Sequence, residues 1–214
     1  MTTITSDLHC GPLTRRAGPI ALVAGVFVVA TDLVRLVCSD RSNLVATMSD
    51  PVFLVGNAGY FFALCALAVA LVAVYGLQAT KSGWLRAVGF GAALVGTMNM
   101  AGNMWFEGFA VPWLAEVLPA VFTAEKTTIL QVGGLSSYLL FALGWVLYGL
   151  ASIRARAYPI LLCLSLIVSG VLGFRAGGPP YGVPIGLTFI ALGWWLLRAR
   201  PEQRAAAEPT PMGN

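Results

Sequence analysis

Three charged side chains lie deep inside long apolar stretches of the sequence, away from the ends of those stretches. Asp32 and Arg35 belong to the stretch 18–38, and Glu107 belongs to the stretch 84–113. Charges at membrane depth are costly, so they pair with other groups or mark a functional site. Asp32 and Arg35 are three residues apart and can meet on one face of a helix. The sequence leaves open whether Arg35 pairs with Asp32 or reaches Glu107 across the bundle.

A stripe of polar residues leads to Glu107. Asn99, Asn103 and Glu107 follow one another at intervals of four residues, which places them on one helix face. In one interpretation the asparagines hydrogen-bond to neighbouring helices and water reaches Glu107. In the other, the stripe is catalytic: Glu107 protonates an olefin or epoxide, and Asp32 stabilises the resulting cation.

Further polar and aromatic residues fall at a similar depth. Asn57 lies early in the stretch 52–77, Trp105 lies close to Glu107, and Tyr138 lies in the stretch 130–153. Aromatic ring faces attract cations, and an aromatic cavity with one acid suits an amphiphilic or isoprenoid-like ligand. The candidate ligand-binding residues are Arg35, Asn57, Asn99, Asn103, Trp105 and Tyr138. The alternative for each aromatic residue is packing or anchoring at the membrane interface.

The elements that must position these residues are transmembrane helices. Of the 214 residues, 58% are hydrophobic and 10% are charged, whereas soluble domains are about half apolar and a quarter charged. Six apolar runs approach or exceed the roughly 20 residues that span a bilayer: 18–38, 52–77, 84–113, 130–153, 158–174 and 181–197. The sequence therefore predicts an all-α polytopic membrane protein. A six-helix domain at 18–198 would lie between a tail at 1–17 and a disordered tail at 199–214.

Basic residues predict the orientation of the bundle in the cell membrane. One side would carry Arg15, Arg16, Lys81, Arg86, Arg154, Arg156, Arg198, Arg200 and Arg204, and the other Arg41, Lys126 and Arg175. The positive-inside rule then places both termini in the cytoplasm. Lys81 and Arg86 are assigned to the connection between the second and third helices, and Pro112 is expected to end the third helix. The polar residues fall in the outer half and the inner halves look nearly apolar, so the site would open outward.

Several classes of site are not expected. The single histidine is His9, and Cys10, Cys38, Cys65 and Cys163 form no cluster, so we expect neither a metal nor another cofactor. No basic stretch is dense enough to bind nucleic acid. The expected partners are the lipid bilayer and a lipophilic small molecule, and the sequence does not determine the oligomeric state.

Residues 105–119 (WFEGFAVPWLAEVLP) and the closing segment 170–195 resemble small polytopic membrane proteins that are common in high-GC actinobacteria. Most of those have no assigned function, so this resemblance implies a fold. Trp105, Glu107 and Pro112 are also similar to the integral-membrane terpene cyclases of meroterpenoid and indole-sesquiterpene pathways, which place a membrane-level acid in a Trp–Glu context shortly before a proline. Two features depart from that pattern: Phe106 separates Trp105 from Glu107, and the second acid, Asp32, precedes Glu107.

Three hypotheses for the function follow. The first is an integral membrane protein whose outward-facing polar and aromatic pocket binds a small amphiphilic or isoprenoid-like molecule. The second is a metal-independent membrane-embedded terpene cyclase that acts by acid protonation through Glu107 and Asp32. The third is a small structural subunit of a membrane complex.

Overall fold

The computed structural model describes residues 12–37, 44–77, 84–122, 124–125 and 127–207. Within these residues the regular structure is helical and contains no strand. The long helices are α2 (Ala17–Val37), α4 (Pro51–Gly76), α5 (Trp84–Trp105), α7 (Thr128–Arg154), α8 (Ile160–Gly173) and α9 (Val183–Ala207). The short elements are α1 (Pro12–Arg15), α3 (Leu44–Met48), the π-helix η1 (Phe106–Ala110), α6 (Val111–Val117) and the 3₁₀-helix η2 (Pro119–Phe122). Residues 1–11 and 208–214 of the two predicted tails lie outside the described part.

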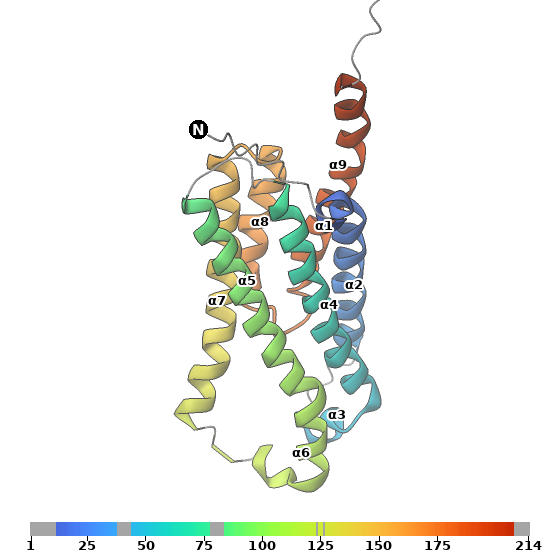
Figure 1. Ribbon diagram of the computed structural model, residues 1–214. Coiled ribbons are helices and arrows are strands. Elements are labelled where there is room, and N and C mark those ends of the chain that lie inside the picture. Colours follow the sequence, from blue (N-terminus) through green and yellow to red (C-terminus); the bar gives the residue numbers. More distant parts are fainter. Residues whose placement is uncertain (1–11, 38–43, 78–83, 123, 126, 208–214) are drawn as a thin grey trace, which may run out of the picture.

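The long helices run roughly along one axis (Figure 1). Three of them, α2, α4 and α7, are long and apolar enough to cross a membrane. Large apolar side chains such as Val23, Phe62 and Leu143 are exposed on these helices. An exposed surface of this kind is compatible with insertion into lipid.

The third helix was predicted to end at Pro112, and this prediction is wrong. After α5, the chain forms one π-helical turn, and α6 then continues through Pro112 to Val117. The amide of Val111 donates to the carbonyl of Phe106, five residues earlier. In a regular α-helix the ring of Pro112 would clash with the carbonyl of Gly108. The wider π-turn directly before it has the form in which this rare structure mostly occurs, a single turn inside an α-helix.

The first and last long helices approach each other closely at glycines. A Cβ atom on Gly25 of α2 would lie 2.5 Å from the carbonyl oxygen of Gly186 in α9. A Cβ atom on Gly193 of α9 would lie 2.6 Å from the amide nitrogen of Leu22 in α2. Small residues permit this backbone-to-backbone contact, as they do between many membrane helices.

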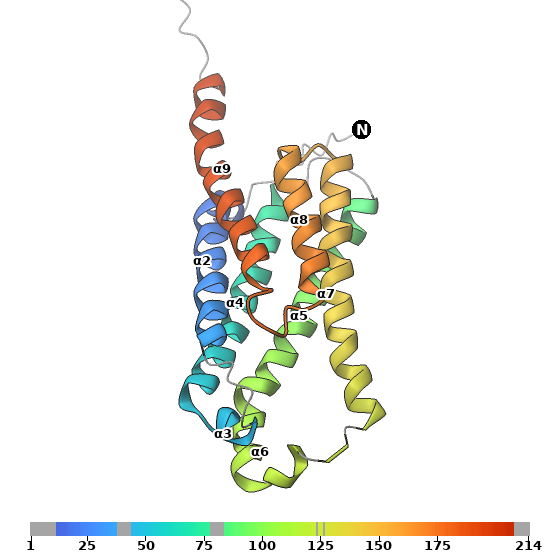
Figure 2. The same ribbon diagram turned by 180° about the vertical axis from the view of Figure 1, so that it is seen from behind.

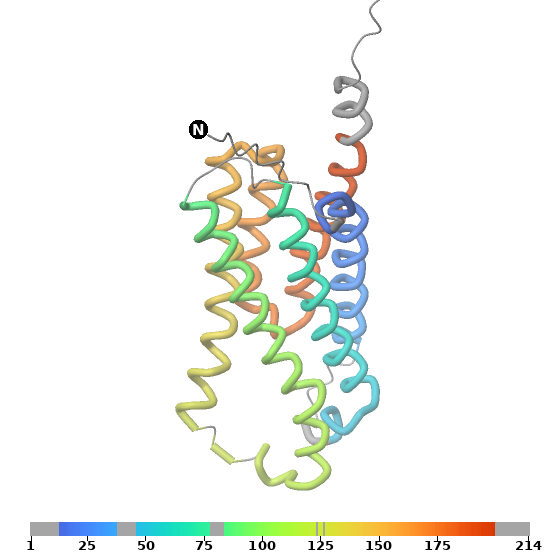
Figure 3. The backbone as a smooth tube through the Cα atoms, in the orientation of Figure 1, coloured from blue at the N-terminus to red at the C-terminus, as the bar shows by residue number. Residues whose placement is uncertain are grey.

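The connection between α8 and α9, residues 174–182, lies part-way along the bundle and not at its end (Figures 1 and 2). The reason is length, because α8 has 14 residues and its neighbour α7 has 27. At 1.5 Å per residue, α8 is roughly 20 Å shorter than α7. The tube in Figure 3 shows α5 and α7 continuing past this connection. The connection therefore contributes its backbone to the interior.

The glycine contact between α2 and α9 gives a test of the fold. We expect Gly25→Ala to lower the thermal stability of the detergent-solubilised protein, because the new methyl group meets backbone atoms and overpacking costs about 1–3 kcal/mol. The matched control is Gly91→Ala, since a Cβ atom there meets no atom within 4 Å. The measurement is the fraction that stays monodisperse in size-exclusion chromatography after heating. Equal losses in the two variants would contradict the close packing of α2 on α9.

Candidate functional site

Arg35 of α2 is the centre of a buried polar cluster. Its Nε donates to Oδ1 of Asn57 in α4 at 2.9 Å, and its Nη1 donates to Oδ1 of Asp32 at 3.1 Å. The same guanidinium donates to the carbonyls of Ala176, at 3.5 Å from Nη1, and Gly177 in the α8–α9 connection. One side chain thus joins three segments that are distant in the sequence. Asp32, Arg35, Asn57 and Glu107 are called the Arg35 cluster below.

The helix α4 is shaped to receive this guanidinium. A Cβ atom on Gly56 would lie 3.0 Å from Cγ of Arg35, so the glycine leaves room for the arginine stem. The Nδ2 group of Asn57 donates to the carbonyl of Phe53 at 2.9 Å, which turns Oδ1 toward Arg35. One turn later the ring of Tyr60 lies 4.5 Å from the guanidinium carbon, a cation–π contact.

Asp32 is fully buried and both of its carboxylate oxygens accept hydrogen bonds. Oδ1 accepts from Arg35, and Oδ2 accepts from the amides of Gly182 at 2.8 Å and Val183 at 3.1 Å. These amides belong to the start of α9, where backbone N–H groups lack helical partners and favour a negative charge. Asp32 therefore anchors the N-terminus of α9.

Glu107 lies at the edge of the same cluster. Its Oε2 is 4.0 Å from Nη2 of Arg35, and its side chain is 28% exposed. The next residue, Gly108, permits this approach, because a Cβ atom there would lie 2.6 Å from the amide nitrogen of Ala58 in α4. The structure thus brings both candidate acids to one guanidinium, with Asp32 bonded directly and Glu107 at the limit of an ion pair.

The stripe of asparagines faces α7. Nδ2 of Asn103 lies 3.4 Å from Oε1 of Glu107 and 3.3 Å from the hydroxyl of Tyr138. Farther along α5, Oδ1 of Asn99 accepts from Oγ of Ser137 at 2.9 Å. Asn103 therefore connects Glu107 to Tyr138, whereas Asn99 makes a contact between α5 and α7 only and is otherwise exposed.

A cavity of about 300 Å³ lies beside Tyr138. Aromatic, arginine and backbone groups line it: Tyr138, Phe174, Arg175, Gly177, Gly178, Pro179 and Tyr181. Its wall is the α8–α9 connection, which Arg35 holds from the other side through the Gly177 carbonyl. The volume is at the lower end of the range for small-molecule sites, which are mostly apolar with a few polar groups. This space is called the Tyr138 cavity below.

The candidate residues divide between the cluster and the outer surface. Trp105 is 50% exposed and packs beside Phe109 with ring centroids 6.0 Å apart, so it does not line the Tyr138 cavity. Sequence reasoning missed the carbonyls of Ala176 and Gly177 and the amides of Gly182 and Val183. The short fifth apolar run was a signal for them, because a short helix leaves its following turn inside the bundle.

Comparisons of the chain with protein-family models, with curated proteins and with solved structures find no match. The resemblances to actinobacterial membrane proteins and to terpene cyclases therefore stay predictions. The argument for function rests on the geometry of the Arg35 cluster and the Tyr138 cavity.

Coupling between Asp32 and Arg35 can be measured with a double-mutant cycle. We expect Asp32→Asn and Arg35→Met each to lower the thermal stability strongly, because breaking a buried pair costs about 3–5 kcal/mol. The double variant should lose less than the sum of the single losses, because it leaves no unpaired charge. Glu107→Gln, which changes a partly exposed side chain 4.0 Å from Arg35, should have a smaller effect. Strictly additive losses at Asp32 and Arg35 would contradict the pairing.

Proposed function

We propose that the chain is a six-span membrane protein that binds a small amphiphilic or isoprenoid-like molecule in the Tyr138 cavity. The observation that carries this proposal is the link from the cavity to the buried charges. Tyr138 lines the cavity, its hydroxyl lies 3.3 Å from Nδ2 of Asn103, and Asn103 lies 3.4 Å from Glu107. A ligand in the cavity would therefore have apolar walls and one polar end.

The six-span topology is supported by the arrangement of helices. In addition to the three long apolar helices, α8 and residues Val183–Ala199 of α9 are shorter apolar helices, and α5 packs along α7 and α4. Arg15 lies just before α2, and Arg86 lies near the start of α5. Arg154 ends α7, and Arg198 lies in α9. In an alternating bundle these positions share one side, which the positive-inside rule assigns to the cytoplasm. Both termini would then be cytoplasmic.

The chemistry of the cavity defines the ligand that fits it. The rings of Phe174 and Tyr181 and the ring of Pro179 offer apolar surface for a hydrocarbon portion. The polar groups of the lining are the Tyr138 hydroxyl, which is both a donor and an acceptor, and the Arg175 guanidinium, which is a donor. A short isoprenoid or acyl chain with a hydroxyl head group satisfies both ends.

One observation favours the cyclase alternative, and another weakens it. Glu107 is an acid with a partly exposed side chain close to the Tyr138 network, as an acid catalyst would need. Asp32 is fully buried, is already paired with Arg35 and the amides at the start of α9, and does not line the cavity. A cyclase would thus depend on Glu107 alone, and binding is the function that the geometry supports better.

Ligand binding is tested by thermal shift with farnesol, an isoprenoid alcohol. Saturating farnesol should raise the unfolding temperature of the detergent-solubilised protein, because a ligand at 100 times its Kd stabilises by about 2.7 kcal/mol. Tyr138→Phe should reduce the shift, since it removes the hydroxyl at the polar end. Trp105→Phe is the control and should leave the shift unchanged. A shift that is absent, or that does not depend on Tyr138, would refute this ligand site.

A separate assay distinguishes binding from catalysis. We expect the wild-type protein in detergent to return an epoxidised farnesyl substrate unchanged after prolonged incubation, measured by gas chromatography with mass spectrometry. The matched variant is Glu107→Gln. Cyclised product from the wild type that disappears in Glu107→Gln would establish the enzyme and overturn the binding function.

A further inference from the structure

A second buried arginine lies far from the Tyr138 cavity, at the start of α5. Arg86 is 5% exposed, and its Nε and Nη1 atoms have no hydrogen-bond partner among the described residues. Its guanidinium carbon lies 5.7 Å from the ring of Tyr75 in α4, and that ring stacks on Phe90 at 4.0 Å. The sequence placed Arg86 in the connection between the second and third helices, and that expectation is wrong, because Arg86 lies within α5 and its side chain is buried.

Among the residues whose side chains the structure describes, no carboxylate pairs with Arg86. Arg35, the other buried arginine, has Asp32 beside it. By contrast, the sequence has no Asp or Glu at 12–31, 51–106 or 126–201, which covers the described part of the bundle at this end. A buried charge without a counter-charge is strongly unfavourable. The counter-charge for Arg86 must therefore come from a side chain outside the described residues or from another molecule.

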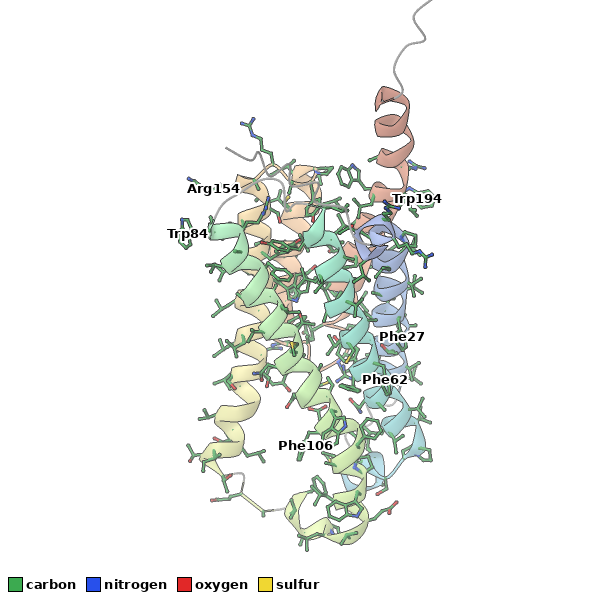
Figure 4. The ribbon with its side chains drawn as sticks, viewed as in Figure 1. Phe27, Phe62, Trp84, Phe106, Arg154 and Trp194 are labelled. Atoms are coloured by element: carbon green, nitrogen blue, oxygen red, sulfur yellow. The ribbon has the colours of Figure 1, made fainter. Side chains whose placement is uncertain are left out.

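The surroundings of Arg86 are basic and are marked by interface aromatics. Figure 4 shows Trp84, Arg154 and Trp194 toward the same end of the bundle. Trp84 is 78% exposed, and the guanidinium of Arg198 lies 4.7 Å from the ring of Trp194. Exposed tryptophans with arginines are typical of the depth at which lipid head groups lie. Anionic lipid is attracted to such a basic boundary.

A second unpartnered donor lies at the same level. The Oγ atom of Ser152 in α7 is buried and makes no hydrogen bond. Gly89, one turn after Arg86, packs against the residue before this serine, because a Cβ atom on Gly89 would lie 3.1 Å from Cβ of Ala151. The interior at this end therefore holds a guanidinium and a hydroxyl group that have no hydrogen-bond acceptor among the described residues.

We propose that Arg86, assisted by Ser152, binds a phosphate group, and that the phosphate belongs to an anionic phospholipid or to a free phosphate ion. Arginine suits phosphate because its charged N–H groups form strong hydrogen bonds with phosphate oxygens. This site is independent of the Tyr138 cavity, since it uses other residues at the other end of α5 and α7.

The test uses the full chain in dodecyl maltoside, a detergent without phosphate. Phosphatidylglycerol, inorganic phosphate, and diacylglycerol as a phosphate-free lipid are added separately, and the unfolding temperature is measured. We expect a rise of about 5 °C with saturating phosphatidylglycerol and none with diacylglycerol. A rise with inorganic phosphate alone would support the same site with a soluble anion as its ligand.

Two variants assign the effect to Arg86. Arg86→Met should remove the response and should unfold no earlier than the wild type without lipid, because it deletes an unpaired buried charge. Arg154→Gln, an exposed arginine near the same end, should keep the response. If Arg86→Met does not fold, Arg86→Lys replaces it and Arg154→Gln stays the control. Native mass spectrometry then measures the phosphatidylglycerol that each variant retains, and we expect Arg86→Lys to retain less.

Three results would overturn the proposal. The first is a response to phosphate or phosphatidylglycerol that Arg86→Met and Arg86→Lys share with the wild type. The second is no response in the wild type, and the third is an internal partner from the acids whose side chains lie outside the described part. In that case Asp7→Asn or Glu202→Gln would lower the unfolding temperature in lipid-free detergent, and Arg86→Met would lower it equally.

Discussion

The structure depends on how one guanidinium is neutralised away from water. Arg35 is buried, and in an apolar environment every one of its N–H groups needs an acceptor. It finds Asp32 on its own helix, Asn57 on α4 and two carbonyls on the α8–α9 connection. The arginine therefore fixes the position of three segments at once. Gly177 of this connection takes part in both features, because its carbonyl accepts from Arg35 and the residue also lines the Tyr138 cavity.

The π-turn in the third apolar run contributes a residue to the same Arg35 cluster. A proline in the interior of a helix removes a hydrogen bond and crowds the preceding turn, and the π-turn at Phe106–Ala110 lies directly before Pro112. Glu107 and Gly108 both belong to this turn. The glycine brings the turn against Ala58 of α4, and Glu107 thereby comes within 4.0 Å of Arg35. A local distortion of the backbone and a long-range charge contact thus coincide at one place.

The lengths of the apolar runs allowed most helices to be predicted from the sequence. The site was predicted less completely, because backbone groups form part of it. The runs at 18–38 and 52–77 correspond to Ala17–Val37 and Pro51–Gly76, and Asp50 caps the second of these with a 2.8 Å bond from the amide of Val52. The spacing of Asp32 and Arg35 allowed a contact between them, but the sequence left open whether Arg35 pairs with Asp32 or with Glu107. In the structure Arg35 donates to Asp32, and Glu107 lies 4.0 Å from the guanidinium. Carbonyls and amides that complete the cluster have no signature in residue type, and the short fifth apolar run was the one signal that the following turn lies within the bundle. Arg86 was placed in a connection because the sequence shows only that a basic residue lies near a helix end. It does not show which neighbouring helices bury the side chain.

The contact between Asp32 and the start of α9 has a consequence for how the chain is made. Asp32 is 150 residues away from Gly182, the residue whose amide it accepts. At roughly 5–20 residues per second, ribosomes need about 8–30 s to synthesise that length. In the membrane protein proposed above, α2 enters the lipid during this interval without the last helix. The ion pair within α2 would make that entry feasible, because Arg35 neutralises Asp32 before any partner from the C-terminal half has been translated. The short spacing of the pair thus allows Asp32 to be neutralised early in synthesis. The hydrogen bonds between Asp32 and the start of α9 form once α9 has been translated.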